Sequence, residues 1–230
     1  MYILHYAPDN ASLVVRLALE ELDLPYRTAL VDRRIRQQKS AAYLALNPSG
    51  LIPVLETPEG PISETGAILL WLSEAHGRLA PQPGAAARGV FLKWLFAVSN
   101  TLHAELRMVF APGQYVGGDF EAREALHEGV TARLAGHYRL LDDLAGAGVD
   151  WFGGAEPSIL DLYVAVTMRW AALYAPMGAW FRLADFPALA RLAAGLEGRA
   201  SVLAAARAEG LGARPFTAPE VSQPPDGSAL

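Results

Sequence analysis

The turn at residues 7–12, A-P-D-N-A-S, gathers side chains that can donate or accept a proton. Before it, Y-I-L-H-Y at 2–6 alternates apolar and polar residues and predicts a short strand. After it, the apolar spacing of L-V-V-R-L-A-L-E-E-L predicts a helix over about 12–23. Because N–H groups at a helix start attract negative charge, this turn suits either chemistry on an anion or a plain N-cap.

A second stretch, N-P-S-G-L-I-P-V-L at 47–55, places a proline where a strand should begin. Pro53 has no N–H, so it belongs at a strand start or edge. One interpretation is a turn that leads into an edge strand. The other is a cis Ile52–Pro53 bond that turns the backbone of Ile52 toward an extended ligand. Cis bonds are the minority even before proline, so spacing alone favours trans.

A third stretch, I-S-E-T-G-A-I at 62–68, puts Glu64 and Thr65 in the first turn of a predicted helix over 65–76. An acid there complements the helix dipole, and local sequence alone favours this reading. Alternatively, Glu64 accepts an ammonium group while Thr65 and the helix N–H groups hold a carboxylate. Together they would capture the head group of an α-amino acid.

The composition excludes several kinds of chemistry. The 230 residues are 52% hydrophobic and carry a formal net charge of −5, which argues for a globular core and against a nucleic-acid partner. Without cysteine, the chain can form no disulfide, thiolate metal site or cysteine nucleophile. The histidines form no H-x-x-x-H pair, and E-x-x-H at Glu124 and His127 stands alone, so we predict no metal.

The chain also lacks the patterns of membrane or secreted proteins. We find no basic segment followed by an apolar one at the N-terminus, which argues against a signal peptide. The longest apolar run, 67–72, is far shorter than the ~20 residues that span a bilayer. We therefore expect a cytoplasmic location and no membrane partner.

Alternating strands and helices in the first third of the chain predict an α/β layer. Besides the elements above, we predict strands over 27–32, 53–56 and 61–63 and a short helix over 40–46. The segment 78–87 predicts a linker after a first domain at 1–77. Beyond it we predict an all-helical domain at 88–212 and a flexible tail at 213–230. The helices of the all-helical domain are predicted over 88–111, 120–145, 158–174, 187–197 and 200–208.

In P-S-I-L-D, Ser158 and Asp161 have the spacing of a capping box, to which we assign a folding role.

Taken in order, these motifs resemble those of cytosolic glutathione transferases, and the bacterial beta class is nearest. The similarity rests on A-P-D-N-A-S, N-P-S-G-L-I-P-V-L, S-E-T-G-A-I-L-L-W-L and F-G-G-A-E-P-S-I-L-D-L-Y, and it extends to about residue 210. Each motif alone is weak, but their order and spacing together are specific. The resemblance implies a thioredoxin-like N-terminal α/β domain followed by an all-α C-terminal domain, the glutathione transferase fold.

The resemblance also implies a glutathione site. Pro53 would be the family's cis-proline, and the backbone of Ile52 would pair with the ligand's cysteinyl residue by strand addition. Glu64 and Thr65 would hold the γ-glutamyl end. Gln38 and Lys39 match positions that reach the glycyl carboxylate, although a solvated loop charge is an equal alternative for Lys39.

Two residues of the helical domain join this expected site. In the beta class, a histidine nine residues after a tryptophan points at the glutathione thiol, and His103 stands at that spacing from Trp94. Arg107 lies one turn further on the same face and would meet an acidic or electrophilic second substrate. Packing for the histidine and a solvent-facing position for the arginine are the alternatives.

The expected thiolate donor departs from the beta class. Ala11 stands where that class has its cysteine, which excludes a mixed disulfide with the enzyme. Ser12 is the first choice as donor to the thiolate, with Tyr6 and Asn10 as alternatives, because relatives use Tyr, Ser or Asn near this turn. A purely structural role for Ser12 is the competing interpretation.

The implied activity is that of a detoxifying glutathione transferase. Glutathione thiolate, as co-substrate, would attack a small electrophile or a peroxide, and the chain would form a homodimer. The alternative is a non-catalytic protein of the same fold that binds glutathione or another ligand.

Overall fold

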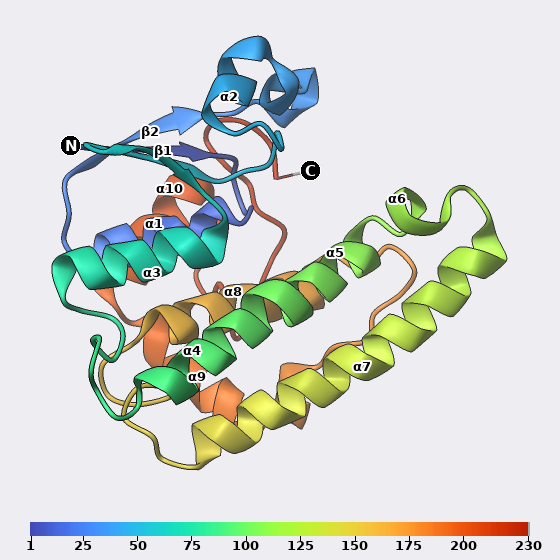
Figure 1. Ribbon diagram of the computed structural model, residues 1–230. Coiled ribbons are helices and arrows are strands. Elements are labelled where there is room, and N and C mark those ends of the chain that lie inside the picture. The colour runs from blue at the N-terminus through green and yellow to red at the C-terminus, as the bar shows by residue number, and fades with distance from the viewer. Residues whose placement is uncertain (230) are drawn as a thin grey trace.

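A four-stranded sheet forms the N-terminal part of the chain, in a computed structural model that describes residues 1–229 (Figure 1). The strands lie in the order β2-β1-β3-β4. They are β1 (Tyr2–Tyr6), β2 (Tyr26–Leu30), β3 (Val54–Thr57) and β4 (Gly60–Ser63). β1 and β2 are parallel, whereas β3 pairs antiparallel with β1 and β4. This mixed sheet is the predicted α/β layer.

The parallel pair needs a crossover connection, which helix α1 (Ser12–Glu21) supplies. Helix α3 (Thr65–His76) packs beside α1 on the same face, and α2 (Ala41–Leu46) lies on the other (Figure 1). Residues 12–19 of α1 are all buried because the sheet covers one side of the helix and the C-terminal helices cover the other. Two 3₁₀ turns, Arg33–Ile35 and Gln37–Lys39, lead into α2.

The second part is helical, and residues 88–229 contain no strand. Its helices are α4 (Arg88–Ala97), α5 (His103–Phe110), α6 (Gly113–Val116), α7 (Phe120–Gly146), α8 (Ile159–Leu173), α9 (Pro187–Glu197) and α10 (Ala200–Glu209). The single helix predicted over 88–111 is interrupted by a π turn, Val98–Leu102, which places His103 at the start of α5. Short α6 and a 3₁₀ turn at Leu183–Asp185 were not predicted. No helix within residues 1–229 is long and apolar enough to cross a membrane.

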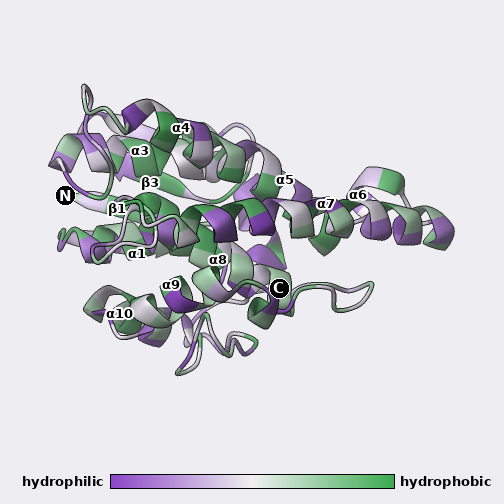
Figure 2. Ribbon diagram, turned by 90° about the horizontal axis from the view of Figure 1, so that it is seen from below, coloured by the Kyte–Doolittle hydropathy of each residue, from purple (hydrophilic) through white to green (hydrophobic). Residues whose placement is uncertain are grey.

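Helix α8 forms the centre of the molecule, between α1 and α9 (Figure 2). Its first thirteen residues, Ile159–Ala171, are buried. The predicted capping box at its start is confirmed: Ser158 Oγ accepts from the Leu160 N–H at 3.1 Å, and Asp161 Oδ2 accepts from the Ser158 N–H at 2.7 Å. The box lets a helix end enter the core without leaving its N–H groups unpaired.

The C-terminal segment runs from α10 back to the sheet, where its end lies near β2 and α2 (Figure 1). Along this path Gln223 N–H donates to the Gly210 carbonyl at 2.8 Å, and Arg33 Nη1 donates to the Ala229 carbonyl at 2.7 Å. Phe216 is buried. The flexibility expected for 213–230 stays a prediction, and residue 230 lies outside the described residues.

Candidate functional site

Ser12 begins α1, but its side chain turns back into the protein. Its Oγ donates to the Ala7 carbonyl at 3.0 Å and accepts from the Ala7 N–H at 3.3 Å. The side chain is fully buried. Because a hydroxyl carries one proton, Ser12 would have to break the first of these bonds to donate to a sulfur atom. The contact closes the turn, which is the competing structural role, and the predicted role as thiolate donor stays untested.

Asn10 is placed differently in the same turn. It is partly exposed, and no hydrogen bond within residues 1–229 uses its side-chain amide. Its carbonyl accepts from the Leu13 N–H at 2.8 Å, while the N–H groups of Ala11 and Ser12 have no acceptor in that range. Since Ser12 is 0% exposed, the groups that the turn presents at the helix start are the Asn10 amide and the Ala11 N–H, two donors that suit an anion.

Tyr6, the third predicted donor, packs at the end of β1 against α1. The Arg16 guanidinium lies 4.7 Å from the centre of its ring, and the side chain is buried. Burial raises the pKa of Tyr6, although the charge of Arg16 opposes this shift. Tyr6 therefore stays protonated at neutral pH, and its ring is committed to packing.

The Ile52–Pro53 bond is cis. The family resemblance implies this conformation, whereas the spacing alone favours trans. The Leu51 carbonyl, just before it, accepts from Tyr43 Oη at 2.8 Å and from Asn47 Nδ2 at 2.8 Å. No backbone hydrogen bond of Ile52 appears within residues 1–229. The loop thus holds Ile52 in place while leaving its backbone groups available to an extended ligand.

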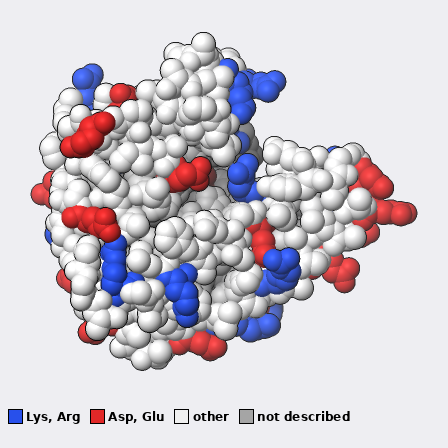
Figure 3. Space-filling view, in the orientation of Figure 1, with Lys and Arg blue, Asp and Glu red and all other residues white. Residues whose placement is uncertain are grey.

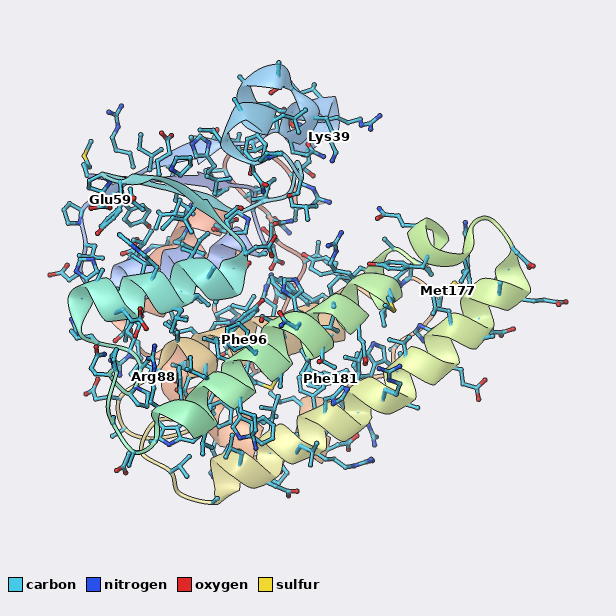
Figure 4. The ribbon with its side chains drawn as sticks, in the orientation of Figure 1. Lys39, Glu59, Arg88, Phe96, Met177 and Phe181 are labelled. Carbon is cyan, nitrogen blue, oxygen red and sulfur yellow. The ribbon has the colours of Figure 1, made fainter. Side chains whose placement is uncertain are left out.

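Gln38 and Lys39 border this loop from the 3₁₀ turn before α2. Lys39 Nζ donates to the Ser49 carbonyl at 3.1 Å, and the side chain is exposed. Gln38 Oε1 is buried without a hydrogen-bond partner. Figure 4 places Lys39 beside α2, across the sheet from Glu59 in the β3–β4 turn. A carboxylate near Lys39 would therefore lie on the α2 side of the cis-proline.

Glu64 adopts φ 70° immediately before α3, a backbone region that residues other than glycine rarely occupy. Such strain costs about 1–3 kcal/mol and gathers at functional sites. The Glu64 carboxylate has no hydrogen bond or ion pair within residues 1–229. Thr65, the first residue of α3, is buried close to the Tyr163 hydroxyl. The helix start thus presents a free carboxylate, a hydroxyl and backbone N–H groups.

His103 also contacts the Tyr163 hydroxyl. Its Nδ1 lies 2.8 Å from Tyr163 Oη, and its ring packs 5.1 Å from that of Trp170, measured between centroids. Burial, with a smaller contribution from Arg107, lowers the pKa of His103 from 6.5 to about 4. His103 is therefore neutral at pH 7, with one ring nitrogen able to donate. Through Tyr163, the structure brings His103 and Thr65 together.

Arg107 is exposed on α5, one turn after His103, and has no carboxylate partner within residues 1–229. Phe110, on the same face of the helix, packs edge-on against Trp170 and Tyr174 of α8. Figure 3 shows the surface hollowed between the α2 segment and the projecting ends of α5 and α7, with Lys and Arg side chains beside the hollow. An arginine beside partly exposed aromatic rings suits a flat substrate with negative charge.

Sequence reasoning singled out none of three polar residues that contact the 8–12 turn or His103: Asp9, Tyr163 and Arg169. Asp9 lies in the turn at 7–12, and Tyr163 and Arg169 lie in the helix predicted over 158–174. Their partners are distant in the chain, as the separation of 160 residues between Asp9 and Arg169 illustrates. Only the polarity of residues 163 and 169 within an otherwise apolar helix could have drawn attention to them.

Comparison with known proteins places this chain in a family. Residues 11–75 match the family model described as "Glutathione S-transferase, N-terminal domain". Glutathione S-transferase GstB of Escherichia coli is 30% identical over 154 residues, which are 66% of this chain and 73% of that protein. A sphingomonad glutathione S-transferase solved with glutathione is 30% identical, with a TM-score of 0.73 over 91% of this chain and all of that one. A beta-class enzyme of Sphingomonas chungbukensis is 27% identical, with a TM-score of 0.71 over 90% of this chain and 98% of that one.

A thioredoxin-like sheet with a cis-proline, followed by a helical domain, is the glutathione transferase fold. This chain belongs to the glutathione S-transferase family and lies close to beta-class structures, although it has no cysteine.

Proposed function

We propose that this protein is a glutathione transferase that binds glutathione along the cis-proline loop and stabilises its thiolate at the 8–12 turn. The observation that carries the proposal is the strained Glu64, whose unpaired carboxylate stands beside Thr65 at the start of α3. Glu64 would accept from the γ-glutamyl ammonium group, and Thr65 with the helix N–H groups would hold its carboxylate. The sphingomonad relative solved with glutathione supports glutathione as the ligand.

The rest of glutathione would extend from this end toward α2. The backbone of Ile52 would pair with the cysteinyl residue as an added strand. Gln38 and Lys39 would meet the glycyl carboxylate, for which Lys39 supplies the charge and the Gln38 amide a neutral donor. In this pose the sulfur reaches the turn at residues 8–12.

The chemistry requires that the bound thiol ionise near neutral pH. A free thiol has a pKa near 8.5, and lowering it by about two units takes about 2.7 kcal/mol. One hydrogen bond from a neutral donor to a charged acceptor contributes about 1.5–3 kcal/mol, and a helix N-terminus about 0.3–1 kcal/mol. Asn10 Nδ2 and the Ala11 N–H at the helix start would supply both contributions, because they have no partners within residues 1–229.

His103 would add a donor from the helical domain. With Tyr163 donating to Nδ1, the ring proton lies on Nε2, which can then donate to the thiolate. The sulfur would attack the electrophilic carbon of a small substrate and displace its leaving group, while the thiol proton passes to solvent. A peroxide is the alternative acceptor. Because the reaction consumes reduced glutathione, we propose the reducing cytoplasm as its compartment and detoxification as its role.

We also propose that the protein is a homodimer that uses the outer face of α4 and α7. Val90 and Phe96 of α4 and Leu140 of α7 are about half exposed, at 49%, 49% and 53%. Between these helices lies an apolar groove of about 120 Å³ that Trp94, Leu102 and other apolar residues line. Figure 4 shows Phe96 on α4. Sedimentation of wild type and Phe96→Glu would test this proposal, and two monomeric proteins would contradict it.

Calorimetry and turnover assays test the main proposal. Glu64→Gln should weaken glutathione binding about 10- to 100-fold, the loss of about 1.5–3 kcal/mol expected for a charged hydrogen bond. Glu59→Gln, the same change on the exposed turn at the opposite end of strand β4, is the matched control and should leave binding unchanged. Conjugation of chlorodinitrobenzene then separates a transferase from a binding protein. Binding without turnover of any tested electrophile or peroxide would favour the non-catalytic alternative.

A further inference from the structure

Asp9, in the 8–12 turn, has a fully buried carboxylate that accepts from residues of helix α8 and from Tyr174, which follows the helix. Arg169 Nε donates to Oδ1 at 2.9 Å and Arg169 Nη2 donates to Oδ2 at 2.8 Å. Trp170 Nε1 donates to Oδ1 at 3.2 Å, and the Tyr174 hydroxyl donates to Oδ2. Both side chains of the ion pair are 0% exposed. This geometry joins the turn to the other domain by a two-pronged ion pair and two further hydrogen bonds.

Arg169 also binds the C-terminal segment. Its Nη1 donates to the carbonyls of Leu211 and Pro215 at 3.3 and 3.1 Å, and its Nη2 donates to that of Glu220 at 2.8 Å. All three acceptors are backbone groups of residues 211–220. A single guanidinium therefore fixes the 8–12 turn and this segment relative to one another.

The backbone of Asp9 is held as firmly as its side chain. Its N–H donates to Glu209 Oε2 at 2.8 Å, while Glu209 Oε1 accepts from Arg16 Nε at 2.7 Å. Its φ of 48° is a left-handed conformation that aspartate, asparagine and glycine tolerate best. Position 9 therefore requires both a backbone that tolerates this conformation and a side chain that accepts from Arg169.

Asp9 directly precedes the groups to which we assign the thiolate. Asn10 has no side-chain partner within residues 1–229, so its own contacts do not set the direction of its amide. The direction of the Asn10 amide therefore depends on the neighbouring backbone. The contacts of Asp9 hold the backbone before Asn10, and the Ser12–Ala7 hydrogen bonds hold the backbone after it. Small displacements of groups that stabilise charge lower reaction rates strongly.

We propose that Asp9 and Arg169 are positioning residues: their buried ion pair, held by residues 211–220, orients the Asn10 amide and the Ala11 N–H toward the glutathione sulfur. Neither side chain reaches the sulfur itself, since both are fully enclosed by protein. The inference rests on the proposed function. The inference adds to the proposed function a role in thiol ionisation for two residues that lie outside the glutathione site.

The test compares Asp9→Asn, Arg169→Gln and Tyr174→Phe with wild type. The main measurement is the pKa of the bound thiol, read from the ultraviolet absorbance of the thiolate as pH rises. We expect Asp9→Asn to raise this pKa by about one unit, which corresponds to about tenfold less thiolate near neutral pH. Glutathione affinity measured on the thiol form should change by less than about threefold, because Glu64, Ile52 and Lys39 are untouched.

Glu21→Gln is the matched control. Glu21 pairs with Arg199 across the same two domains, but it does so at the opposite end of α1 from the turn. A variant that only loosens the domains should lose stability without any change in thiol pKa. A double-mutant cycle tests whether the two residues act as a unit. The variant that carries both Asp9→Asn and Arg169→Gln should shift the thiol pKa by no more than either single substitution does.

Amide hydrogen exchange separates failure of this inference from failure of the proposed function. If wild type does not ionise bound glutathione, the proposed function fails. The Leu13 N–H donates to the Asn10 carbonyl, so its exchange rate reports how firmly the turn is held. That rate then decides whether Asp9 positions the turn. Faster exchange in Asp9→Asn than in Glu21→Gln supports the positioning role. Equal exchange, or an unchanged thiol pKa in a glutathione-binding protein, overturns it. Should Asp9→Asn not fold, Tyr174→Phe, which removes one donor, must give a smaller shift in the same direction.

Discussion

The hydroxyl of Ser12 donates its proton to the carbonyl of Ala7, 3.0 Å away, at the point where strand β1 gives way to helix α1. This bond uses the proton that a thiolate donor would need. It also leaves Asn10, two residues earlier, as the polar side chain of the turn without a partner within residues 1–229. The geometry thus favours Asn10 over Ser12 as the donor.

Substitution of these two residues should therefore have opposite outcomes. Ser12→Ala should lower the free energy of unfolding by about 1 kcal/mol and leave kcat/KM within about threefold, because it removes a buried hydrogen bond. Asn10→Ala should lower kcat/KM about tenfold or more through the loss of a donor to a charged sulfur. Steady-state kinetics and urea denaturation measure both quantities. A rate loss confined to Ser12→Ala would return the assignment to the serine.

Stability should depend on pH through His103. Its folded pKa of about 4 lies below the ordinary 6.5, so the unfolded chain binds more protons between these values. Stability should therefore rise with pH across this window and fall as pH drops toward 4, by up to about 3 kcal/mol. His103→Gln should flatten this part of the profile in urea denaturation, whereas His127→Gln on α7 should not. If the stability of His103→Gln changed with pH as that of wild type does, a group other than His103 would dominate the pH dependence.

Arg107 should distinguish electrophiles by charge. Arg107→Ala should raise KM for a carboxylate-bearing aromatic substrate, such as chloronitrobenzoate, about two- to fivefold, the size expected for an exposed ion pair. The neutral chlorodinitrobenzene should be affected less. Arg139→Ala, an exposed arginine on α7, is the matched control. Equal effects on both substrates would remove Arg107 from the second-substrate pocket.

The capping box of α8 should contribute more to stability than a surface cap. Ser158→Ala should cost about 1–2 kcal/mol in unfolding free energy. Asp161→Ala should cost more, because its carboxylate accepts from the Gly153 N–H, the Ser158 N–H and the Ser158 hydroxyl. Asp119→Ala, an exposed N-cap of α7 that accepts from Glu121, is the comparison, at about 0.5–1 kcal/mol. Equal losses at all three positions would contradict the buried role.

Elements with strong local signals were predicted well. The strand at 2–6 and the helices at 65–76 and 187–197 have the predicted bounds, because turn residues and apolar spacing mark both ends. The π turn inside 88–111 was missed, since neither glycine nor proline marks it. It lies where Ser99 meets the start of α3: a Cβ added at Gly66 would stand 3.2 Å from the Ser99 side chain. Packing between domains leaves no local pattern in the sequence.

The sequence by itself determined that any reactive thiol must belong to a ligand, because the chain has no cysteine. The order of its motifs also determined the fold and the positions of Ile52, Pro53, Glu64 and Thr65. Only the tertiary structure decided which way the side chains of the 8–12 turn point. The single proton of Ser12 is used within the turn, and the carboxylate of Asp9 is held by Arg169, 160 residues away. Residue types limit which hydrogen bonds can form, but the bonds that do form depend on the groups that folding brings within about 3 Å.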